Sequence, residues 1–431
     1  MSQRVLRVGM LGCGTVGAAA IRLLHKHRDD ISRRAGCRLE VTRVAVRDPS
    51  RGRDVPLSPE AFVTDPMAVV EDPDIDIVCE LIGGIEPAGS LILAAFDREK
   101  PVVTANKELL ATRGRELFDA SDAKGLDLYF EAAVGGGIPL IRPLKESLSG
   151  ERIRRVLGIV NGTTNFILTK MSEEDRAFDD VLADAQRLGY AEADPAADVE
   201  GHDAAAKCAI LASIAFNARV TASDVFREGI TGVTTEDIEF ARRLGYVVKL
   251  LAIAEMGDDE RIAARVHPAM IPAAHPLANV RDAFNAVFVE GDAVGELMFY
   301  GRGAGGDPTA TAVVGDLVSV ARNLLAEARG VGCTCFHERT IRPMAEMTGQ
   351  YYILLRVEDR PGVLAEIASV FGRSDVSIKS VWQEGTGEDA QLVFVTHRAM
   401  EGSFQTAVSE LRALPAVEEV RSVLRVEAEE P

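Results

Sequence analysis

A glycine-rich pattern, Gly-x-Gly-x-x-Gly at residues 12–17, constrains the fold more than any other feature of the sequence. An apolar run at 4–11 precedes it, and a helical repeat of apolar residues follows at 16–24. Between a strand and a helix, the first glycine permits a tight turn, the second admits a pyrophosphate, and the third packs the helix on the strand. The alternative is an ordinary glycine turn. We predict dinucleotide-binding residues at Gly12, Gly14, Thr15, Val16 and Gly17.

Short apolar runs alternate with helical patterns through the first third of the chain. Alternation of this kind indicates a parallel sheet with right-handed crossovers. We therefore predict an N-terminal Rossmann-like, doubly wound α/β domain over residues 1–135. Its further strands are expected at 39–46, 75–79, 101–103 and 126–130, and its helices at 89–98 and 107–124.

Two further domains are expected. Residues 136–304 mix strands and helices, which indicates an α+β substrate and dimerisation domain. Residues 350–431 follow the order βαββαβ, the ferredoxin-like arrangement. A long helix at 309–328, within a segment 305–345, is expected to pack back on the first domain. In the middle domain we expect strands at 152–160, 261–267, 286–290 and 294–300, and helices at 172–190 and 204–216.

Composition excludes several classes of protein. A chain of 431 residues is long enough for about three domains. Its formal charge of −18 would repel nucleic-acid phosphates and anionic lipid. No apolar stretch is long enough to span a membrane. Six scattered cysteines are typical of reduced thiols in a cytoplasmic protein.

Cofactor choice is expected to depend on the end of the second strand, which reads Val46-Arg47-Asp48-Pro49-Ser50-Arg51-Gly52-Arg53. An acidic residue there would hold the ribose of NAD, whereas arginine suits the 2′-phosphate of NADP. Arg47 therefore favours NADP over NAD, unless these arginines only solvate a loop. Thr104 and Lys107 follow another predicted strand, where ligands of such sheets bind. Lys107 would hold an anionic substrate or the cofactor, or else be an exposed helix-start residue.

Acidic residues and one lysine gather around the start of the apolar helix at 204–216. Asp203 and Lys207 are four residues apart and share one helix face. A lysine in an apolar run is costly unless paired, and it could deliver a proton to a developing alkoxide. Glu192, Asp198 and Asp203 could receive a substrate ammonium group. The alternative is a surface ion pair of little energetic consequence.

The turn after the first domain reads Glu131-Ala-Ala-Val-Gly-Gly-Gly-Ile-Pro139. A carboxylate before a glycine-rich turn can present carbonyl oxygens to a hard cation. From the residues alone, a simple connection into the second domain is the better interpretation.

Seven motifs occur in an order that covers residues 1 to about 345. They are Gly12-x-Gly14-x-x-Gly17, Thr104-Ala-Asn-Lys107, Glu131-Ala-Ala-Val-Gly-Gly-Gly-Ile-Pro139, Asn161-Gly-Thr-Thr-Asn165, Leu188-Gly-Tyr-Ala-Glu192-Ala-Asp-Pro195, Asp203-Ala-Ala-Ala-Lys207 and Gly301-x-Gly303-Ala-Gly305. Together they resemble homoserine dehydrogenase. The C-terminal segment, with Asp359-Arg-Pro361-Gly362-Val363-Leu364, resembles an ACT domain.

The resemblance implies reversible reduction of L-aspartate 4-semialdehyde to L-homoserine by NAD(P)H, in threonine and methionine biosynthesis. It implies Lys207 as proton donor and Lys107 as the residue that orients substrate and cofactor. It also implies that Asp203, Glu192 and the backbone of Gly189 contact the substrate. Gly303 or Gly305 would close over the cofactor. The implied monovalent-cation site, for a sodium-like ion, consists of Glu131, Val134, Gly136 and Ile138.

An ACT-like module suggests feedback inhibition by L-threonine. The predicted regulatory residues are Asp359, Pro361, Gly362 and Val363. The alternative is a dimerisation module without a ligand. A homodimer through the middle domain is expected, with a tetramer through the ACT-like modules as the alternative. Two other functions compete: another nicotinamide-dependent oxidoreductase for a small aldehyde or keto acid, and a non-enzymatic regulator that senses a nucleotide.

Overall fold

We analysed a computed structural model, which describes residues 4–335, 337–387 and 390–428. The chain forms two compact units. The first contains Met1–Val156, Ala206–Asp224 and Asn285–Arg339, and the second contains Leu157–Ala205, Val225–Phe284 and Thr340–Pro431. Among the described residues, no helix combines the length and apolar character needed to cross a bilayer.

The first unit contains the predicted Rossmann-like sheet, in which every neighbouring pair of strands is parallel. The order reverses direction between β1 and β4, the switch point at which such sheets bind ligands. Across the sheet the strands are β3 (Phe62–Val63), β2 (Arg38–Ala45), β1 (Val5–Leu11), β4 (Ile77–Glu80), β5 (Val102–Thr104) and β6 (Leu128–Tyr129).

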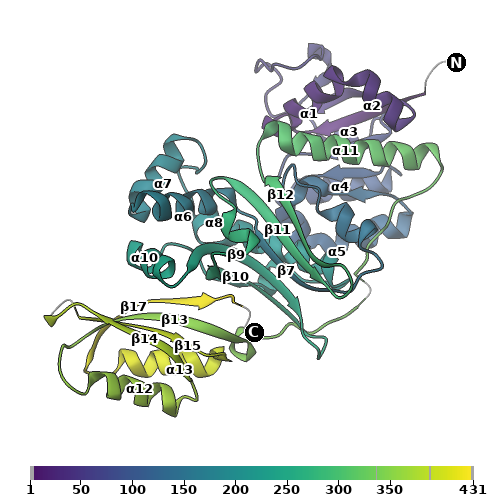
Figure 1. Cartoon of the computed structure of the whole chain (residues 1–431). Coiled ribbons are helices and arrows are strands. Elements are labelled where there is room, and N and C mark those ends of the chain that lie inside the picture. Colours follow the sequence, from purple (N-terminus) through teal and green to yellow (C-terminus); the bar gives the residue numbers. More distant parts are fainter. Residues whose placement is uncertain (1–3, 336, 388–389, 429–431) are drawn as a thin grey trace. The chain divides into compact units, whose positions relative to one another are not determined.

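Helices cover this sheet, and one of them comes from far along the chain. α11 (Gly306–Leu325) lies beside α1 (Thr15–Lys26) and α2 (Arg28–Ala35) in Figure 1. Val313 and Leu317 of α11 share a buried core with residues of β1 and α1. The long helix after the middle segment therefore packs back on the N-terminal sheet. The remaining helices of the sheet are α3 (Met67–Val70), α4 (Ala88–Asp97) and α5 (Lys107–Lys124).

The first unit also includes parts of the chain's middle segment. These are the short helical turns η2 (Glu131–Ala133) and η3 (Pro143–Ser147), and strands β11 (Phe284–Gly291) and β12 (Gly295–Arg302). Unit boundaries fall within β7 (Ile153–Ile159), within α9 (His202–Ala215) and after the first residue of β11, so these elements continue from one unit into the other.

The second unit begins with helices that carry the predicted substrate loop. The prediction of one helix over 172–190 was wrong, because the chain forms α6 (Gly162–Glu174) and α7 (Phe178–Arg187). Asp175 ends α6 in the left-handed conformation, with φ of 50°. α8 (Ala196–Val199) and the first residues of α9 follow.

A long antiparallel pair forms the centre of the second unit. β9 (Tyr246–Met256) pairs with β10 (Ile262–Pro272) along its whole length. We did not predict β9, because its interior is almost continuously buried and its sequence lacks the polar–apolar alternation of a half-exposed strand. β8 (Phe226–Arg227) also pairs with β10, and α10 (Thr235–Arg243) precedes β9.

The C-terminal segment forms the expected βαββαβ module. Its sheet has the order β17-β13-β15-β14 with antiparallel neighbours, and it joins β10 of the same unit through β17. The elements are β13 (Thr348–Val357), α12 (Val363–Arg373), β14 (Ile378–Glu384), β15 (Gln391–Thr396), the short β16 (Ala399–Met400), α13 (Glu401–Arg412) and β17 (Val417–Val426). Buried side chains between sheet and helices form a core of their own.

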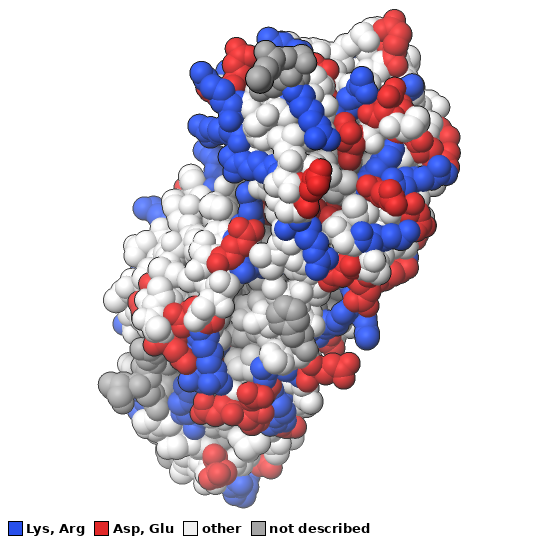
Figure 2. Space-filling model, turned by 90° about the vertical axis from the view of Figure 1, so that its right-hand side faces the viewer, with Lys and Arg blue, Asp and Glu red and all other residues white. Residues whose placement is uncertain are grey.

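Charged side chains of both signs are interspersed on the face that Figure 2 shows. Exposed ion pairs occur in the chain, such as Arg98 with Glu71 at 2.6 Å. Pairs of this kind contribute little to stability. Among the described residues on this face, arginines and lysines do not merge into one continuous basic band, the feature typical of nucleic-acid binding.

Candidate active site

The glycine loop after β1 has the geometry that its three glycines predict. Gly12 has φ of +104°, and a Cβ there would lie 2.7 Å from the carbonyl oxygen of Leu81. A Cβ on Gly17 would lie 2.6 Å from the Gly12 oxygen, so only glycine permits this approach of helix and turn. Gly14 faces open space, with no atom within 4 Å of its built Cβ. The loop thus leaves room for a ligand at the N-terminus of α1.

The ends of the neighbouring strands β4 and β5 follow on the same edge of the sheet as this loop. The buried carboxylate of Glu80, at the end of β4, accepts hydrogen bonds from the Ile82 amide at 2.8 Å and the Thr104 hydroxyl at 2.6 Å. Asn106 caps α5 and donates to the Gly84 oxygen at 2.6 Å. The Thr104 hydroxyl is therefore buried and hydrogen-bonded to Glu80. Lys107 follows in the first turn of α5 and is half-buried.

Arg47 lies just beyond the end of β2 and is exposed. The neighbouring Asp48 carboxylate accepts hydrogen bonds from the amide and hydroxyl of Ser50, at 2.9 and 2.6 Å. These hydrogen bonds, both to Oδ1, lower the pKa of Asp48. Arg53 stacks on the ring of Phe62, with 5.3 Å between guanidinium and centroid. Of the loop's charged residues, Arg47 is the one that directly follows the strand.

A second glycine loop lies beside the first. Gly305 has φ of +120°, and a Cβ on the next residue, Gly306, would lie 3.0 Å from the Thr15 side chain. Gly303 is packed so closely that a Cβ would lie 2.0 Å from the Asn285 side chain. The loop before α11 therefore lies against the start of α1, where a cofactor pyrophosphate would bind.

The carboxylate of Glu131 anchors the turn that was predicted to bind a cation. It is buried and accepts hydrogen bonds from the backbone amides of Leu140, Ile141 and Arg142, the last two at 2.8 and 2.9 Å. The Glu131 amide in turn donates to Asp316 of α11 at 2.8 Å. Burial raises the pKa of Asp316 to about 8, against the opposing charge of Arg142, whose guanidinium lies 3.3 Å from it.

Backbone oxygens, rather than side chains, are the candidate cation ligands of this turn. In the described part of the chain, no hydrogen bond reaches the carbonyl oxygens of Val134, Gly136 or Ile138, although all three residues are buried. Gly136 adopts φ of +55° and abuts Gly303, whose oxygen would lie 2.4 Å from an added Cβ. Buried carbonyl oxygens without donors suit a hard cation. Within the described residues, no cluster of three or more His, Cys, Asp or Glu side chains could hold a metal.

All four predicted substrate residues, and the unpredicted residue Asn161, lie in the second unit. The side-chain amide of Asn161 donates to Asp198 at 2.7 Å and to Asp203 at 2.9 Å. Its oxygen accepts from the Thr164 amide at 2.9 Å, which caps α6. Asn161 thus fixes two carboxylates that are five residues apart in sequence. Asparagine before an apolar helix signals a cap, but nothing in the sequence linked it to the two aspartates.

The loop at Gly189 and Glu192 stays exposed. Gly189 has φ of +77° and open space at its Cβ position, so its backbone is accessible. Tyr190 follows, and its carbonyl oxygen accepts from the Thr163 hydroxyl at 2.6 Å. This contact ties the loop to the start of α6. The Glu192 side chain is exposed and is not one of those that Asn161 holds together.

Lys207 lies one helical turn beyond Asp203 along α9. Only 8% of Lys207 is exposed, whereas Lys107 is half-buried. Neighbouring α9 residues such as Cys208 and Leu211 are apolar and buried. Lys207 is therefore a mostly buried cation on an otherwise apolar stretch of α9.

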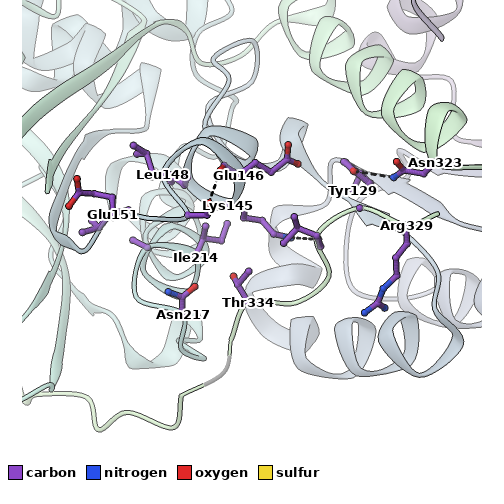
Figure 3. Close-up of a pocket in the computed structure, with 16 residues that line it drawn as sticks. Tyr129, Lys145, Glu146, Leu148, Glu151, Ile214, Asn217, Asn323, Arg329 and Thr334 are labelled. Atoms are coloured by element: carbon purple, nitrogen blue, oxygen red, sulfur yellow. Dashed lines mark hydrogen bonds between the residues drawn. The ribbon is translucent and has the colours of Figure 1, made fainter. Parts of the chain in front are cut away.

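A large cavity of the first unit is lined by a different set of residues (Figure 3). Its volume is about 720 Å³, and none of the predicted substrate or cofactor residues lines it. Lys145 lines the cavity and donates a hydrogen bond to the Val331 oxygen at 3.0 Å. Asn323, also in the lining, donates to the Tyr129 hydroxyl at 3.3 Å. Burial lowers the pKa of Lys145. Lining groups of both charges, including Glu146 and Arg329, give it no clear ligand preference.

The predicted regulatory turn of the C-terminal module is mostly exposed. Asp359 accepts a hydrogen bond from the Gly387 amide at 2.9 Å. Pro361 is exposed, and Gly362 caps α12 with φ of +97°, so its backbone is accessible. Val363 points into the module's core, 3% exposed. Its side chain therefore supports the turn rather than offering a surface to a ligand.

A Rossmann-like sheet with its glycine loop, and a buried lysine on the same helix as one of the clustered carboxylates, are features of a dinucleotide-dependent oxidoreductase. Three family models match the chain in that order. The homoserine dehydrogenase NAD-binding domain matches residues 12–131, the homoserine dehydrogenase domain matches 139–318, and the ACT domain matches 351–416.

Individual relatives agree with these matches. A homoserine dehydrogenase of Corynebacterium glutamicum is 50% identical over 97% of this chain and 95% of its own. The crystal structure of a homoserine dehydrogenase from Thiobacillus denitrificans has a TM-score of 0.93 at 44% identity and covers 99% of both chains. A hyperthermophilic archaeal homoserine dehydrogenase in complex with NADPH has a TM-score of 0.64 at 28% identity, over 76% of this chain and 99% of its own. The chain belongs to the homoserine dehydrogenase family and is an NAD(P)-dependent oxidoreductase.

Proposed function

We propose that this enzyme reversibly reduces L-aspartate 4-semialdehyde to L-homoserine, within threonine and methionine biosynthesis, under feedback control by L-threonine. The observation that carries the substrate assignment is the pair of carboxylates held by Asn161, one helical turn before Lys207. Two adjacent carboxylates favour an ammonium group, and a buried ammonium favours a developing alkoxide. L-Homoserine carries both an ammonium group and an alcohol.

Each residue of the proposed site has a distinct task. Asp203, Asp198 and Glu192 bind the substrate's ammonium group, and the exposed backbone of Gly189 contacts the substrate. A bound nicotinamide supplies the hydride or accepts it. During reduction, Lys207 donates a proton to the former carbonyl oxygen as negative charge develops there. In the reverse direction the neutral amine of Lys207 removes the hydroxyl proton. Lys107 orients the substrate and the cofactor.

The cofactor proposal rests on the two adjacent glycine loops. We infer that NADP is preferred over NAD, because the exposed Arg47 lies just beyond β2, and the archaeal relative in the comparison holds NADPH. The proposed cofactor-binding residues are Gly12, Gly14, Thr15, Val16, Gly17, Arg47, Thr104, Lys107, Gly303 and Gly305. Thr104 would act through its backbone, since its hydroxyl donates to Glu80.

We also infer a monovalent-cation site, for a sodium-like ion, at Glu131, Val134, Gly136 and Ile138. Because the Glu131 carboxylate already accepts three amide hydrogen bonds, Glu131 would contribute its carbonyl oxygen. Exchange of sodium and potassium for tetramethylammonium should lower the thermal midpoint, and added sodium should restore it. A midpoint that is the same in all three salts would exclude the site.

The proposed effector site for L-threonine lies at the turn of Asp359, Pro361, Gly362 and Val363. Its support is the accessible N-terminus of α12, which suits the effector's carboxylate. We further propose a cytoplasmic homodimer, with a tetramer as the alternative. Support for the dimer comes from the edge strand β12, where the apolar side chains of Met298 and Tyr300 are exposed.

An absorbance assay of nicotinamide reduction tests the function directly. Purified protein is mixed with L-homoserine and either NADP or NAD, with sodium present, and millimolar L-threonine is then added. We expect reduction, faster with NADP at low cofactor concentration, and suppression by threonine. Reduction that threonine leaves unchanged would reject the effector proposal alone. Absence of reduction with either cofactor would reject the substrate proposal.

A further inference from the structure

An arginine near the end of the chain makes an unusual set of contacts in the second unit. Arg425 of β17 is 7% exposed, and β17 pairs with β10 in parallel at this residue. Its guanidinium donates to Glu401 of α13 at 2.7 and 3.0 Å, and this pair lies within the ACT module. A third hydrogen bond, of 2.7 Å, reaches Glu228, which lies outside the module. One buried cation therefore joins the module to another segment of the chain.

Glu228 directly follows β8, and β10 holds β8 in place. β8 pairs with β10, and the Glu228 amide donates to the Val266 oxygen at 2.8 Å. The Arg425 guanidinium also stacks on the ring of Phe226 in β8, 5.1 Å from its centroid. β10 thus has β8 and β17 as partners, and the Arg425–Glu228 ion pair connects those two strands.

Gly229 and Ile230, which follow Glu228, contact the segment 199–202 that leads to Asp203. A Cβ on Gly229 would lie 2.3 Å from the Val199 oxygen, so the two backbones are in direct contact. The Ile230 amide donates to that same oxygen at 2.8 Å. Val199 ends α8, immediately after Asp198. The backbone at 229–230 therefore fixes the position of Val199, and with it the position of the neighbouring Asp198, within the unit.

Arg227 makes a second connection to the same segment. Its guanidinium donates to the Glu200 oxygen at 2.9 Å and lies 2.9 Å from Nε2 of His202, the first residue of α9. Between them, Gly201 has φ of +81° and packs against the side chains of Val266 and Arg227. Both ends of the 199–202 segment are therefore bound to the 227–230 segment.

We propose that Arg425 and Glu228 are positioning residues for the substrate loop. The ion pair holds the 227–230 segment, which holds residues 199–202, and these set the separation of Asp198 and Asp203 that Asn161 bridges. The inference rests on the proposed role of the two aspartates as the receptor of the substrate ammonium. Weakening of the ion pair should therefore loosen substrate binding, without affecting the hydride step or the cofactor.

The substitution Glu228→Gln tests this, because it keeps the side-chain shape and leaves Arg425 paired with Glu401. We expect KM for L-homoserine to rise about threefold to tenfold, with kcat and KM for the cofactor changed less than about twofold. Glu228→Asp, which keeps the charge, should recover part of the loss. Glu236→Gln is the matched control, because it removes another ion pair of β17, between Arg421 and α10, that does not touch residues 199–202.

The possible outcomes separate the two proposals. Equal KM values in wild type, Glu228→Gln and Glu236→Gln would overturn the positioning role, as would equal increases in both variants. Parallel measurement of Asp203→Asn tests the basis of the inference. If Asp203→Asn also leaves KM unchanged, the ammonium-receptor assignment itself fails. If Asp203→Asn raises KM while Glu228→Gln does not, only the positioning role fails.

Discussion

The side-chain amide of Asn161 donates a hydrogen bond of 2.9 Å to a carboxylate oxygen of Asp203. The same nitrogen donates to Asp198, so the amide dipole stabilises two negative charges that would otherwise repel one another. Asn161 is buried, and its oxygen caps α6. The fold itself therefore holds the two carboxylates together.

Loss of one of these charges should weaken substrate binding. Asp203→Asn keeps the shape of the side chain but removes the charge that an ammonium would pair with. A charge-assisted hydrogen bond contributes about 1.5–3 kcal/mol, so KM for L-homoserine should rise about tenfold to a hundredfold. Steady-state kinetics with fixed NADP measures this. Asp180→Asn, at an exposed carboxylate of α7, is the control and should leave KM unchanged.

Removal of the Lys207 ammonium should affect turnover rather than binding. Lys207→Met retains a chain of similar length in its buried surroundings, and kcat should fall about a hundredfold to ten-thousandfold because general acid catalysis is lost. Dissociation constants for NADP, from fluorescence titration, should change little. Lys26→Met at the exposed end of α1 is the control. A variant at Lys207 with near-normal kcat would disprove the proton-donor role.

Cofactor preference should depend on Arg47. Arg47→Ala removes the cation proposed to meet the 2′-phosphate, so the ratio of kcat/KM for NADP over NAD should fall about tenfold or more. Activity with NAD should be unaffected, which separates a lost phosphate contact from general damage. Arg51→Ala, in the same exposed loop, is the comparison. Equal ratios in all three proteins would mean that Arg47 only solvates its loop.

The buried carboxyl of Asp316 should make stability fall as pH rises. Its pKa is raised to about 8 in the folded protein, from about 4 when unfolded, so the folded state holds an extra proton between these values. Stability is then lost as pH increases through this window, at up to about 1.4 kcal/mol per pH unit. Asp316→Asn removes this dependence and should keep the hydrogen bond from the Glu131 amide.

Thermal midpoints measured by circular dichroism at intervals from about pH 5 to about pH 8 check this. The advantage of Asp316→Asn over wild type should grow steadily across the range. Asp307→Asn, at an exposed carboxylate of the same helix, should follow the wild-type curve. Parallel curves for wild type and Asp316→Asn would show that Arg142 keeps the carboxylate ionised throughout.

Much of the fold follows from local sequence patterns. Glycines 12, 14 and 17 between a strand and a helix predicted the turn that the structure contains, because the positive φ of Gly12 and the approach of Gly17 to the Gly12 oxygen both arise within the motif. The βαββαβ order of the C-terminal module could also be predicted from the sequence, since its strands and helices are short and clearly bounded. β9 and the break at Asp175 were not, because burial on both faces erases periodicity and a single left-handed residue carries no strong signal.

The sequence by itself determined which chemical groups are available: a dinucleotide loop, Lys107 and Lys207, and a set of acids from Glu192 to Asp203. Helical spacing even placed Asp203 and Lys207 on one face of α9. Only the tertiary structure decided which acids share a partner, that Asn161 joins two of them, and that Arg425 reaches Glu228 across 197 residues of chain. Local patterns report backbone preference and burial, whereas contacts between distant residues depend on how whole elements pack, which no short window of sequence encodes.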